Sequence, residues 1–115
     1  AGIIASLQEQ SSYVAIEMAM FRLPIITTAV DGLDEMFSDN RNALKVNTHF
    51  SRVKRLSVDT EQMALKIITL IEDEMLRVQL SRNARLLYEN EFTLERMMKQ
   101  TLEVYQKVLG GMVYE

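Results

Sequence analysis

The chain has 115 residues, 48% of them hydrophobic and 25% charged, which is the composition of one soluble globular domain with a modest core. Its net charge of −3 argues against general binding of nucleic acids, and no apolar run approaches the roughly 20 residues that cross a bilayer. The absence of cysteine excludes disulfides, thiol catalysis and cysteine-ligated metals.

Residues 1–58 alternate between strand-like and helical patterns. Strands are predicted at Ile3–Ala5, within a continuous apolar run, and at Pro24–Thr27, which is rich in β-branched residues. Ala43–Val46 predicts a third strand, and the segment between the first two predicts a helix over Ser12–Phe21. The apolar stripe of this helix is expected to consist of Val14, Met18 and Phe21. A strand–helix–strand crossover of this kind is parallel and right-handed in nearly every known case.

Residues 31–58 carry weaker signals. Asp31–Gly32 predicts a turn and Leu33–Phe37 a single helical turn, while residues 47–58 show no clean period. The only histidine, His49, is interpreted as a solvated loop residue. The only basic cluster lies in the same segment and consists of Arg52, Lys54 and Arg55. Two interpretations of this cluster stay open, contact with a phosphate or an acidic partner and a solvated loop, and its role is not assigned.

Residues 59–111 predict three helices. Asp59, with Gln62 three residues later, is typical of a capping box, Asp73 begins a second helix and Thr93 a third. Gly110–Gly111 is expected to end the third helix. The apolar faces of the first two helices are expected at Met63, Ala64, Ile67, Ile68 and Ile71, and at Leu76, Leu80, Ala84 and Leu87.

Most catalytic patterns are missing from the sequence. A single histidine and no Gly-x-Ser-x-Gly elbow exclude a serine hydrolase triad, and no Gly-rich phosphate loop or zinc-ligand spacing is present. What remains is Glu9 after the first strand, Ser11 and Ser12 at the start of a helix, and Glu17 within it. Helix N-terminal N–H groups favour phosphate, and carboxylates accept hydrogen bonds from sugar hydroxyls. From spacing alone, the interpretation that a serine simply caps the helix and that Glu17 lies on its solvated face is favoured.

Several segments in order resemble one family. Ser6–Glu9, Glu17–Met20, Leu23–Ile26, Gly32–Glu35 and Asp39–Asn42 are similar to the C-terminal domain of retaining, two-domain glycosyltransferases of the GT-B type, in the group 1 family. In that family two glutamates stand eight positions apart, as Glu9 and Glu17 do here. Positions in the last half that look like its C-terminal helices are Arg77, Ala84, Arg85, residues 92–96 and Tyr105. The resemblance runs over essentially the whole chain and implies an α/β fold. It would be the C-terminal half of a Rossmann-like doubly wound parallel sheet, with about three strands, followed by three C-terminal helices.

Carried over to the matching positions, the resemblance implies a site for a nucleotide-sugar. Glu9 would be the catalytic residue and bind the donor sugar, and Glu17 would hold the ribose. Ser11, Ser12 and Tyr13 would offer main-chain N–H groups to the diphosphate. The implied reaction is transfer of a sugar from a UDP-, GDP- or similar sugar with retention, without metal or cofactor, in polysaccharide or glycolipid synthesis.

The chain also departs from the family pattern. Ala5 stands at a usual proline, residues 10–12 replace Gly-Phe-Gly, and Arg22 and Asn42 stand at usual glycines. The opening in a strand-like run predicts a partial domain, with residues 1–58 as the donor-site part. The family's N-terminal acceptor domain and its phosphate-facing basic residues would then lie elsewhere, and the chain alone would be inactive.

The expected partners and the alternatives complete the sequence-based hypothesis. We expect a cytoplasmic protein that can associate with the inner face of the membrane, and a homodimer through the edge of the first strand. The alternatives are a non-catalytic α/β interaction module and a nucleotide-sugar epimerase of the same fold.

Overall fold

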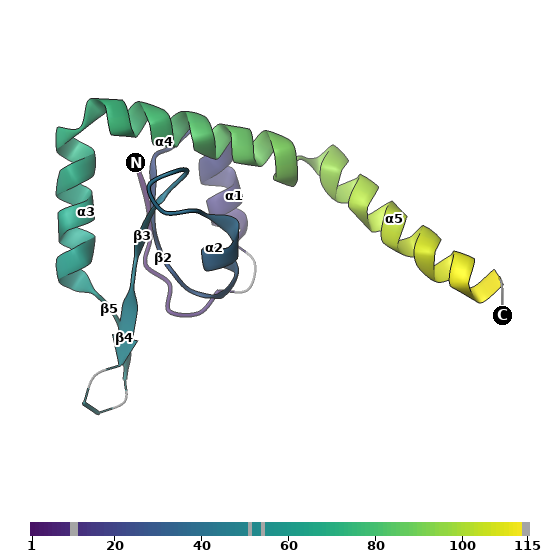
Figure 1. The fold of residues 1–115 in the computed structure, drawn as a ribbon, viewed down its shortest axis with the longest axis horizontal. Coiled ribbons are helices and arrows are strands. Elements are labelled where there is room, and N and C mark those ends of the chain that lie inside the picture. The colour runs from purple at the N-terminus through teal and green to yellow at the C-terminus, as the bar shows by residue number, and fades with distance from the viewer. Residues whose placement is uncertain (10–11, 51, 54, 114–115) are drawn as a thin grey trace.

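A parallel three-stranded sheet organises the N-terminal half of the molecule (Figure 1). The computed structural model describes residues 1–9, 12–50, 52–53 and 55–113. The sheet has the order β1-β2-β3, with β1 at Gly2–Ile4, β2 at Ile25–Thr28 and β3 at Leu44–Val46. The three predicted strands are therefore confirmed, as is the α/β class with half of a Rossmann-like sheet and three C-terminal helices.

Side chains from the two faces of the sheet enter two different cores. Ile25 packs with Ile4 and with residues of the helices α1 (Tyr13–Met20) and α2 (Asp31–Met36). Ile26, the next residue, packs on the opposite face beneath α3 (Thr60–Glu72). All four residues of β2 are buried, which is why the strand reads as a continuous apolar and β-branched run.

The helix after β1 begins where the sequence predicts it but turns a different face inward. Ser12 caps α1, and its Oγ accepts a hydrogen bond from the Ala15 N–H at 3.1 Å. The buried side chains are Ala15 and Ala19, whereas Val14 and Phe21 are exposed, so the predicted stripe is wrong at these two positions. The alanines share a core cluster with Ala84 of helix α4 (Glu74–Leu87), because small side chains allow these two helices to approach closely.

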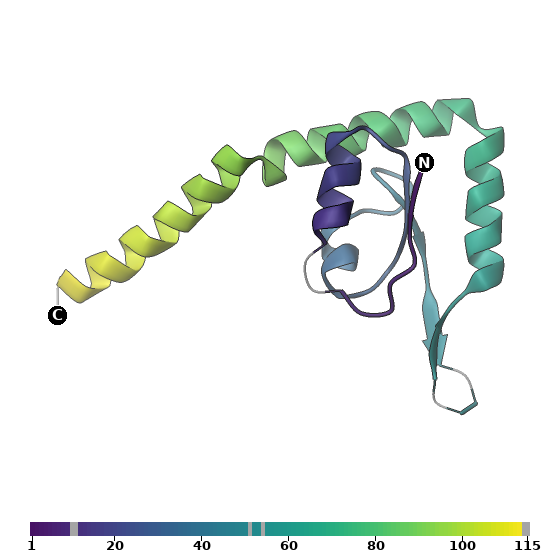
Figure 2. The ribbon, with the colours of Figure 1, turned by 180° about the vertical axis from the view of Figure 1, so that it is seen from behind.

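Two short strands between β3 and α3 pair as a hairpin that the sequence analysis did not predict. Strand β4 (Thr48–Phe50) pairs antiparallel with β5 (Leu56–Val58), and the hairpin extends beyond the sheet in Figures 1 and 2. Each strand has only three residues, which is too short for alternation to stand out in the sequence. Of the basic cluster, Arg52 and Arg55 are exposed, and Lys54 lies outside the described residues.

The predicted helix starts in the second half are confirmed. Asp59, Asp73 and Thr93 each accept a hydrogen bond from a main-chain N–H of the first helical turn, at 3.0, 2.9 and 3.2 Å. In α3 the face that packs inward is Met63, Ile67 and Leu70. Ala64, Ile68 and Ile71 are exposed, so the stripe predicted for α3 is partly wrong.

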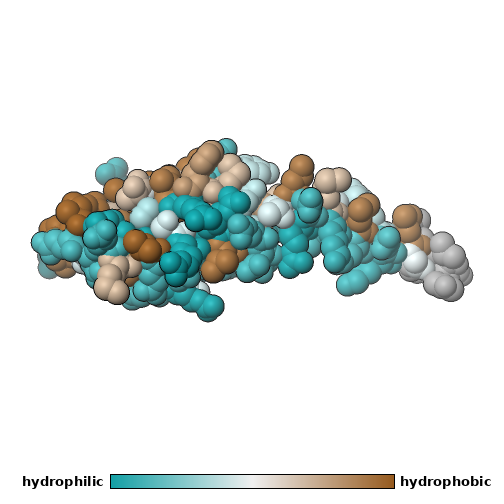
Figure 3. Space-filling model, turned by 90° about the horizontal axis from the view of Figure 1, so that it is seen from above, coloured by the Kyte–Doolittle hydropathy of each residue, from teal (hydrophilic) through white to brown (hydrophobic). Residues whose placement is uncertain are grey.

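The last helix leaves the body of the molecule. A π-helical turn, η1 (Tyr88–Phe92), follows α4, and α5 (Leu94–Val113) then extends outward as an arm (Figures 1 and 2). The helix continues through residues 110–111, so the prediction that the glycine pair ends it is wrong. Apolar side chains are interspersed along this arm in Figure 3. No helix among the described residues is long and apolar enough to span a membrane.

Two of the three positive-φ residues bear on the family comparison. Arg22 has φ 60°, so the position where the resemblance places a glycine does require a left-handed backbone. At the turn before β3, Asn40 takes this conformation with φ 62°, and Asn42 does not. The Asn42 side chain instead accepts a hydrogen bond from the Ser38 N–H at 2.8 Å. Asn42 thus stands at a usual glycine of the family pattern without adopting a left-handed backbone.

Candidate functional site

The candidate site lies at the carboxyl edge of the sheet. The three strands are parallel, so the chain leaves each of them at the same edge, where ligands of open α/β sheets bind. The segment after β1, residues 5–12, leads from this edge to the start of α1; its residues 10–11 are not described. A hollow of about 530 Å³ is lined by β1, Ser6, Glu9 and the first turn of α1.

Glu9 is held by contacts to its main chain and its carboxylate. Ser6 Oγ donates to Glu9 Oε2 at 3.3 Å. The Glu9 N–H donates to Asp31 Oδ2 at 3.3 Å, and the Gly32 N–H donates to the Glu9 carbonyl at 2.9 Å. Asp31, which accepts from the Glu9 N–H, has a φ of 40°, and a positive φ is unusual for residues other than glycine. The loop that carries Glu9 is thus fastened to the start of α2.

The start of α1 faces the same hollow as Glu9. Ser12 is 5% exposed and its hydroxyl oxygen serves as the helix cap, so it can offer a ligand chiefly its main-chain N–H. Tyr13 is 69% exposed and lines the hollow, as does Val14. N–H groups in the first turn have no acceptor within their own helix and attract anions. The predicted Ser11 lies outside the described residues.

Glu17 is the one described candidate that does not line the hollow. It is exposed on α1, four residues after Tyr13 and therefore on the same side of the helix. At 1.5 Å per residue this places it about 6 Å further along the helix axis. The structure thus brings Glu9, Ser12 and Tyr13 together and leaves Glu17 one turn away.

Three residues contribute to the site without having been singled out from the sequence. Ser6 contacts the Glu9 carboxylate, and Asp31 accepts from the Glu9 main chain. Buried Thr28 donates from Oγ1 to the Ser6 carbonyl at 2.5 Å, which joins the ends of β1 and β2. Each lies just past or at the carboxyl end of a predicted parallel strand. Applying the edge rule to all the strands, and not only to the first, would have selected them.

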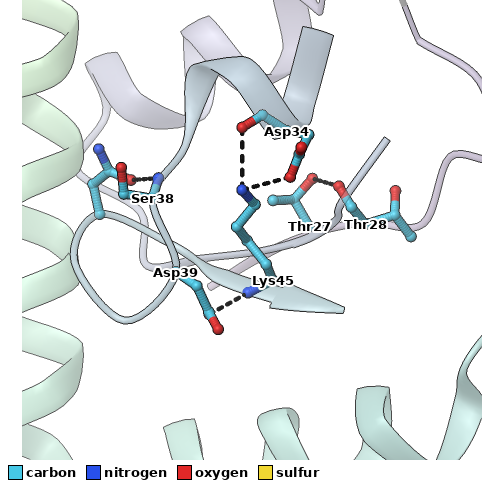
Figure 4. A network of polar contacts seen from close by, with 7 residues as sticks. Thr27, Thr28, Asp34, Ser38, Asp39 and Lys45 are labelled. Atoms are coloured by element: carbon cyan, nitrogen blue, oxygen red, sulfur yellow. Dashed lines mark hydrogen bonds and ion pairs between the residues drawn. The ribbon is translucent and has the colours of Figure 1, made fainter. Parts of the chain in front are cut away.

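The described lining of the hollow contains no lysine or arginine. Lys45 is the only cation within the three strands of the sheet, and Figure 4 shows that it contacts Asp34 and Asp39. Its Nζ lies 2.6 Å from Asp34 Oδ1 and donates to the Asp34 carbonyl at 3.1 Å, while its N–H donates to Asp39 Oδ1 at 2.8 Å. This network fastens α2 to β3. Among the described residues, no group of three or more histidine or acidic side chains is placed to hold a metal ion.

Comparison with known proteins identifies the fold. No protein-family model and no curated protein matches the sequence. Among solved structures, the chain is similar to sucrose-phosphate synthase from Thermosynechococcus elongatus, with a TM-score of 0.79 and 23% identity over 95% of this chain and 25% of that one. It is also similar to the C-terminal domain of a glycosyl transferase group 1 family protein from Francisella tularensis, with a TM-score of 0.65 and 23% identity over 80% of this chain and 43% of that domain.

A third likeness is to the Anabaena protein HepE in complex with UDP, with a TM-score of 0.75 and 18% identity over 87% of this chain and 25% of that one. The chain thus spans less than half the length of each of these structures. At these identities the likeness establishes the fold, which is that of the C-terminal part of GT-B glycosyltransferases and confirms the resemblance read from the sequence.

Proposed function

We propose that the chain is the donor-binding part of a glycosyltransferase, which transfers a sugar from a nucleotide-diphosphate-sugar to an acceptor with retention. The observation that carries the proposal is the position of the Glu9 hollow. It lies at the carboxyl edge of a sheet whose fold is shared with glycosyltransferases, beside the first turn of α1. Carboxylate and N–H groups thus meet at one place, as a sugar diphosphate requires.

Each described residue of the site would contact a different part of the donor. Glu9 would accept hydrogen bonds from hydroxyls of the donor sugar, and the N–H groups of Ser12 and Tyr13 would bind the diphosphate. Glu17, about 6 Å further along α1, would accept from the ribose hydroxyls. Catalysis would rest on positioning the sugar and on stabilising the negative charge of the leaving diphosphate.

The chain alone offers only one side of such a site. The diphosphate carries negative charge, and the described lining provides N–H groups but no cation to neutralise it. We therefore expect the 115-residue chain to bind donors weakly and to be inactive by itself. The whole protein would add an acceptor domain and act in the synthesis of a polysaccharide or glycolipid.

The direct test is an NMR titration of the 115-residue chain with UDP, GDP, ADP and the corresponding nucleotide-sugars. We expect amide shifts confined to residues 9–17. Glu17→Gln should weaken the response to every nucleoside diphosphate, because an amide is a poorer acceptor for the two ribose hydroxyls. Glu61→Gln, an exposed carboxylate in the first turn of α3, is the matched control and should change nothing.

The alternatives give different results. A non-catalytic interaction module predicts that Glu9→Gln and Glu17→Gln leave every response unchanged, or that no nucleotide shifts these amides. An epimerase predicts that the whole protein interconverts nucleotide-sugars without an acceptor. Retention is tested on the whole protein by the anomeric configuration of the first product, and an inverted product would contradict it.

A further inference from the structure

A second hollow, here named the Asn42 hollow, lies at the opposite edge of the sheet from Glu9. The turn of residues 38–42 precedes β3 and therefore lies at the amino edge of the parallel sheet. Between this turn, the C-terminal part of α4 and η1 there is a hollow of about 330 Å³. This volume is at the lower end of the range of about 300–1,000 Å³ that is typical of small-molecule sites. The polar residues that line it are Ser38, Arg41, Asn42, Asn83, Asn90 and Glu91.

Two amide side chains of this hollow are held in one orientation by the fold. Asn42 Oδ1 accepts from the Ser38 N–H at 2.8 Å, a bond drawn in Figure 4, and the Asn42 N–H donates to the Ser38 carbonyl at 3.2 Å. The half-buried Asn83 donates from Nδ2 to the Arg41 carbonyl at 2.6 Å, which fastens α4 to the turn. Each amide thus uses one of its two polar atoms in the fold and keeps the other for a different partner.

The unused donor of Asn42 is the observation that points to a ligand. Asn42 is only 9% exposed, yet no described residue accepts a hydrogen bond from its Nδ2. In the described part of the chain, no polar side-chain atom is both sealed from solvent and without a partner, so this Nδ2 reaches the hollow that Asn42 lines. A donor held in so little exposed a side chain gains more from a hydrogen-bonding ligand than a fully solvated donor does.

The other polar residues complete the hollow without giving it a net charge. Arg41 and Glu91 are exposed, and no described residue forms a hydrogen bond or ion pair with either side chain. One positive and one negative side chain cancel, so the hollow does not favour an ion. Asn90 is placed by the π-helical turn η1, and its carbonyl accepts from Arg96 Nε at 2.7 Å. Such turns occur frequently at functional sites.

From these observations we infer that the Asn42 hollow binds an uncharged sugar ring. Sugar hydroxyls donate and accept in several directions, as do the amides of Asn42, Asn83 and Asn90, which come from three elements. The apolar C–H groups of the ring would pack against Leu86 and Leu87, which also line the hollow. A nucleobase has its polar atoms in one plane and stacks on aromatic rings, which the described lining lacks. The inference does not rest on the proposed function, since the Glu9 hollow shares none of these residues.

The test is an NMR titration of the 115-residue chain with the uncharged methyl glycosides of glucose, galactose, mannose and N-acetylglucosamine. We expect at least one of them to shift the side-chain amide signals of Asn42 and Asn90, and to leave the signals of residues 9–17 unchanged. Asn42→Asp keeps the oxygen that accepts from the Ser38 N–H and removes the donor, so it should weaken binding about tenfold. Asn90→Ala changes an exposed side chain and leaves the turn intact, and it should weaken binding about fivefold.

The matched control for the aspartate variant is Asn47→Asp. It makes the same change at an exposed asparagine just past the carboxyl end of β3, and it should leave the affinity unchanged. Circular dichroism checks that each variant is folded. The inference is overturned if none of the four glycosides shifts the Asn42 and Asn90 signals, or if Asn47→Asp weakens binding as much as Asn42→Asp. It is also overturned if inorganic phosphate shifts these signals and Arg41→Gln abolishes that shift, which would identify an anion site.

Discussion

Replacing Arg22 by glycine should stabilise the protein. The residue lies just past the end of α1, where the Leu23 N–H donates to the Met18 carbonyl at 3.0 Å and the Arg22 N–H to the Ala19 carbonyl at 3.1 Å. This pair of bonds is a Schellman motif, whose left-handed position is most often glycine. Arg22 occupies it with φ 60°, and its carbonyl accepts from Ser81 Oγ of α4 at 2.5 Å, which fixes the conformation.

The magnitude follows from two opposing terms. The left-handed conformation costs a residue with a Cβ roughly 1–2 kcal/mol, and glycine returns about 0.5–1 kcal/mol through the greater freedom of its unfolded state. The net gain for Arg22→Gly is about 1 kcal/mol. For a chain of this length the unfolding entropy converts this gain to a rise of about 4 °C in Tm.

Urea unfolding followed by far-UV circular dichroism measures the effect. Arg22→Gly should raise the midpoint without changing the slope, because only stability is altered. Arg22→Ala is the control, since it removes the side chain and keeps the Cβ, and it should be nearly neutral. If the alanine variant gained as much stability as the glycine variant, the arginine side chain and not the backbone would be the cause, and the reasoning would fail.

Three further predictions concern the sheet and the Glu9 loop. Gly2→Ala should cost at most about 1 kcal/mol in urea unfolding, because a Cβ at Gly2 would overlap the sulfur of Met18, which is near the end of a flexible side chain and can shift. The cost should disappear in a Met18→Ala background, and an equal cost in both backgrounds would refute the overlap. We propose that β1, whose Ile3 is 48% exposed at the edge of the sheet, pairs with β1 of a second copy of the chain. Ile3→Lys should then give a monomer in sedimentation velocity, and a monomeric wild type would contradict this pairing. Asp31→Ala should speed hydrogen exchange of the Glu9 amide about fivefold, because one hydrogen bond is worth about 1 kcal/mol. Asp31→Asn keeps an acceptor and should have little effect. Equal exchange rates in the two variants would exclude the contact.

The elements that the sequence predicts correctly are those whose signal is local. A buried parallel strand needs a continuous apolar run, which β1 and β2 have. A helix start needs an acceptor side chain, which Ser12, Asp59 and Thr93 provide. Residues close in the sequence determine these strands and helix starts, so they can be predicted without knowledge of tertiary contacts.

The elements that the sequence does not predict depend on tertiary contacts. The inward face of α1 is set by Ala15 and Ala19 against α4, and alanine carries little hydrophobic signal of its own. Ile68 and Ile71 of α3 are as apolar as Ile67, yet only Ile67 meets the sheet. The hairpin exists because two segments of three residues each pair across a connection, and neither would be a strand alone.

The same distinction applies to the candidate site. Glu9 and the start of α1 could be located from spacing because each follows a recognisable element. The contacts that hold Glu9 come from Ser6 and from the start of α2, 22 residues later in the chain. Sequence spacing does not connect these segments, and only the edge rule applied to every strand would have brought them together. The sequence thus locates Glu9, which lines the hollow, and misses the contacts that hold it in place.

The contacts that hold Glu9 bear on the glycines that the family pattern has and this chain lacks. Glycine gives a phosphate-facing loop freedom, and freedom that is lost on binding reduces affinity. In this chain the loop after β1 is fastened by Ser6 Oγ, by the Asp31 carboxylate and by the Gly32 N–H. A loop held before the ligand arrives loses less entropy when the ligand binds. Of the residues that replace the family's Gly-Phe-Gly, the structure describes Ser12, which caps α1. At Glu9, side-chain contacts therefore restrict a loop that glycine would leave freer.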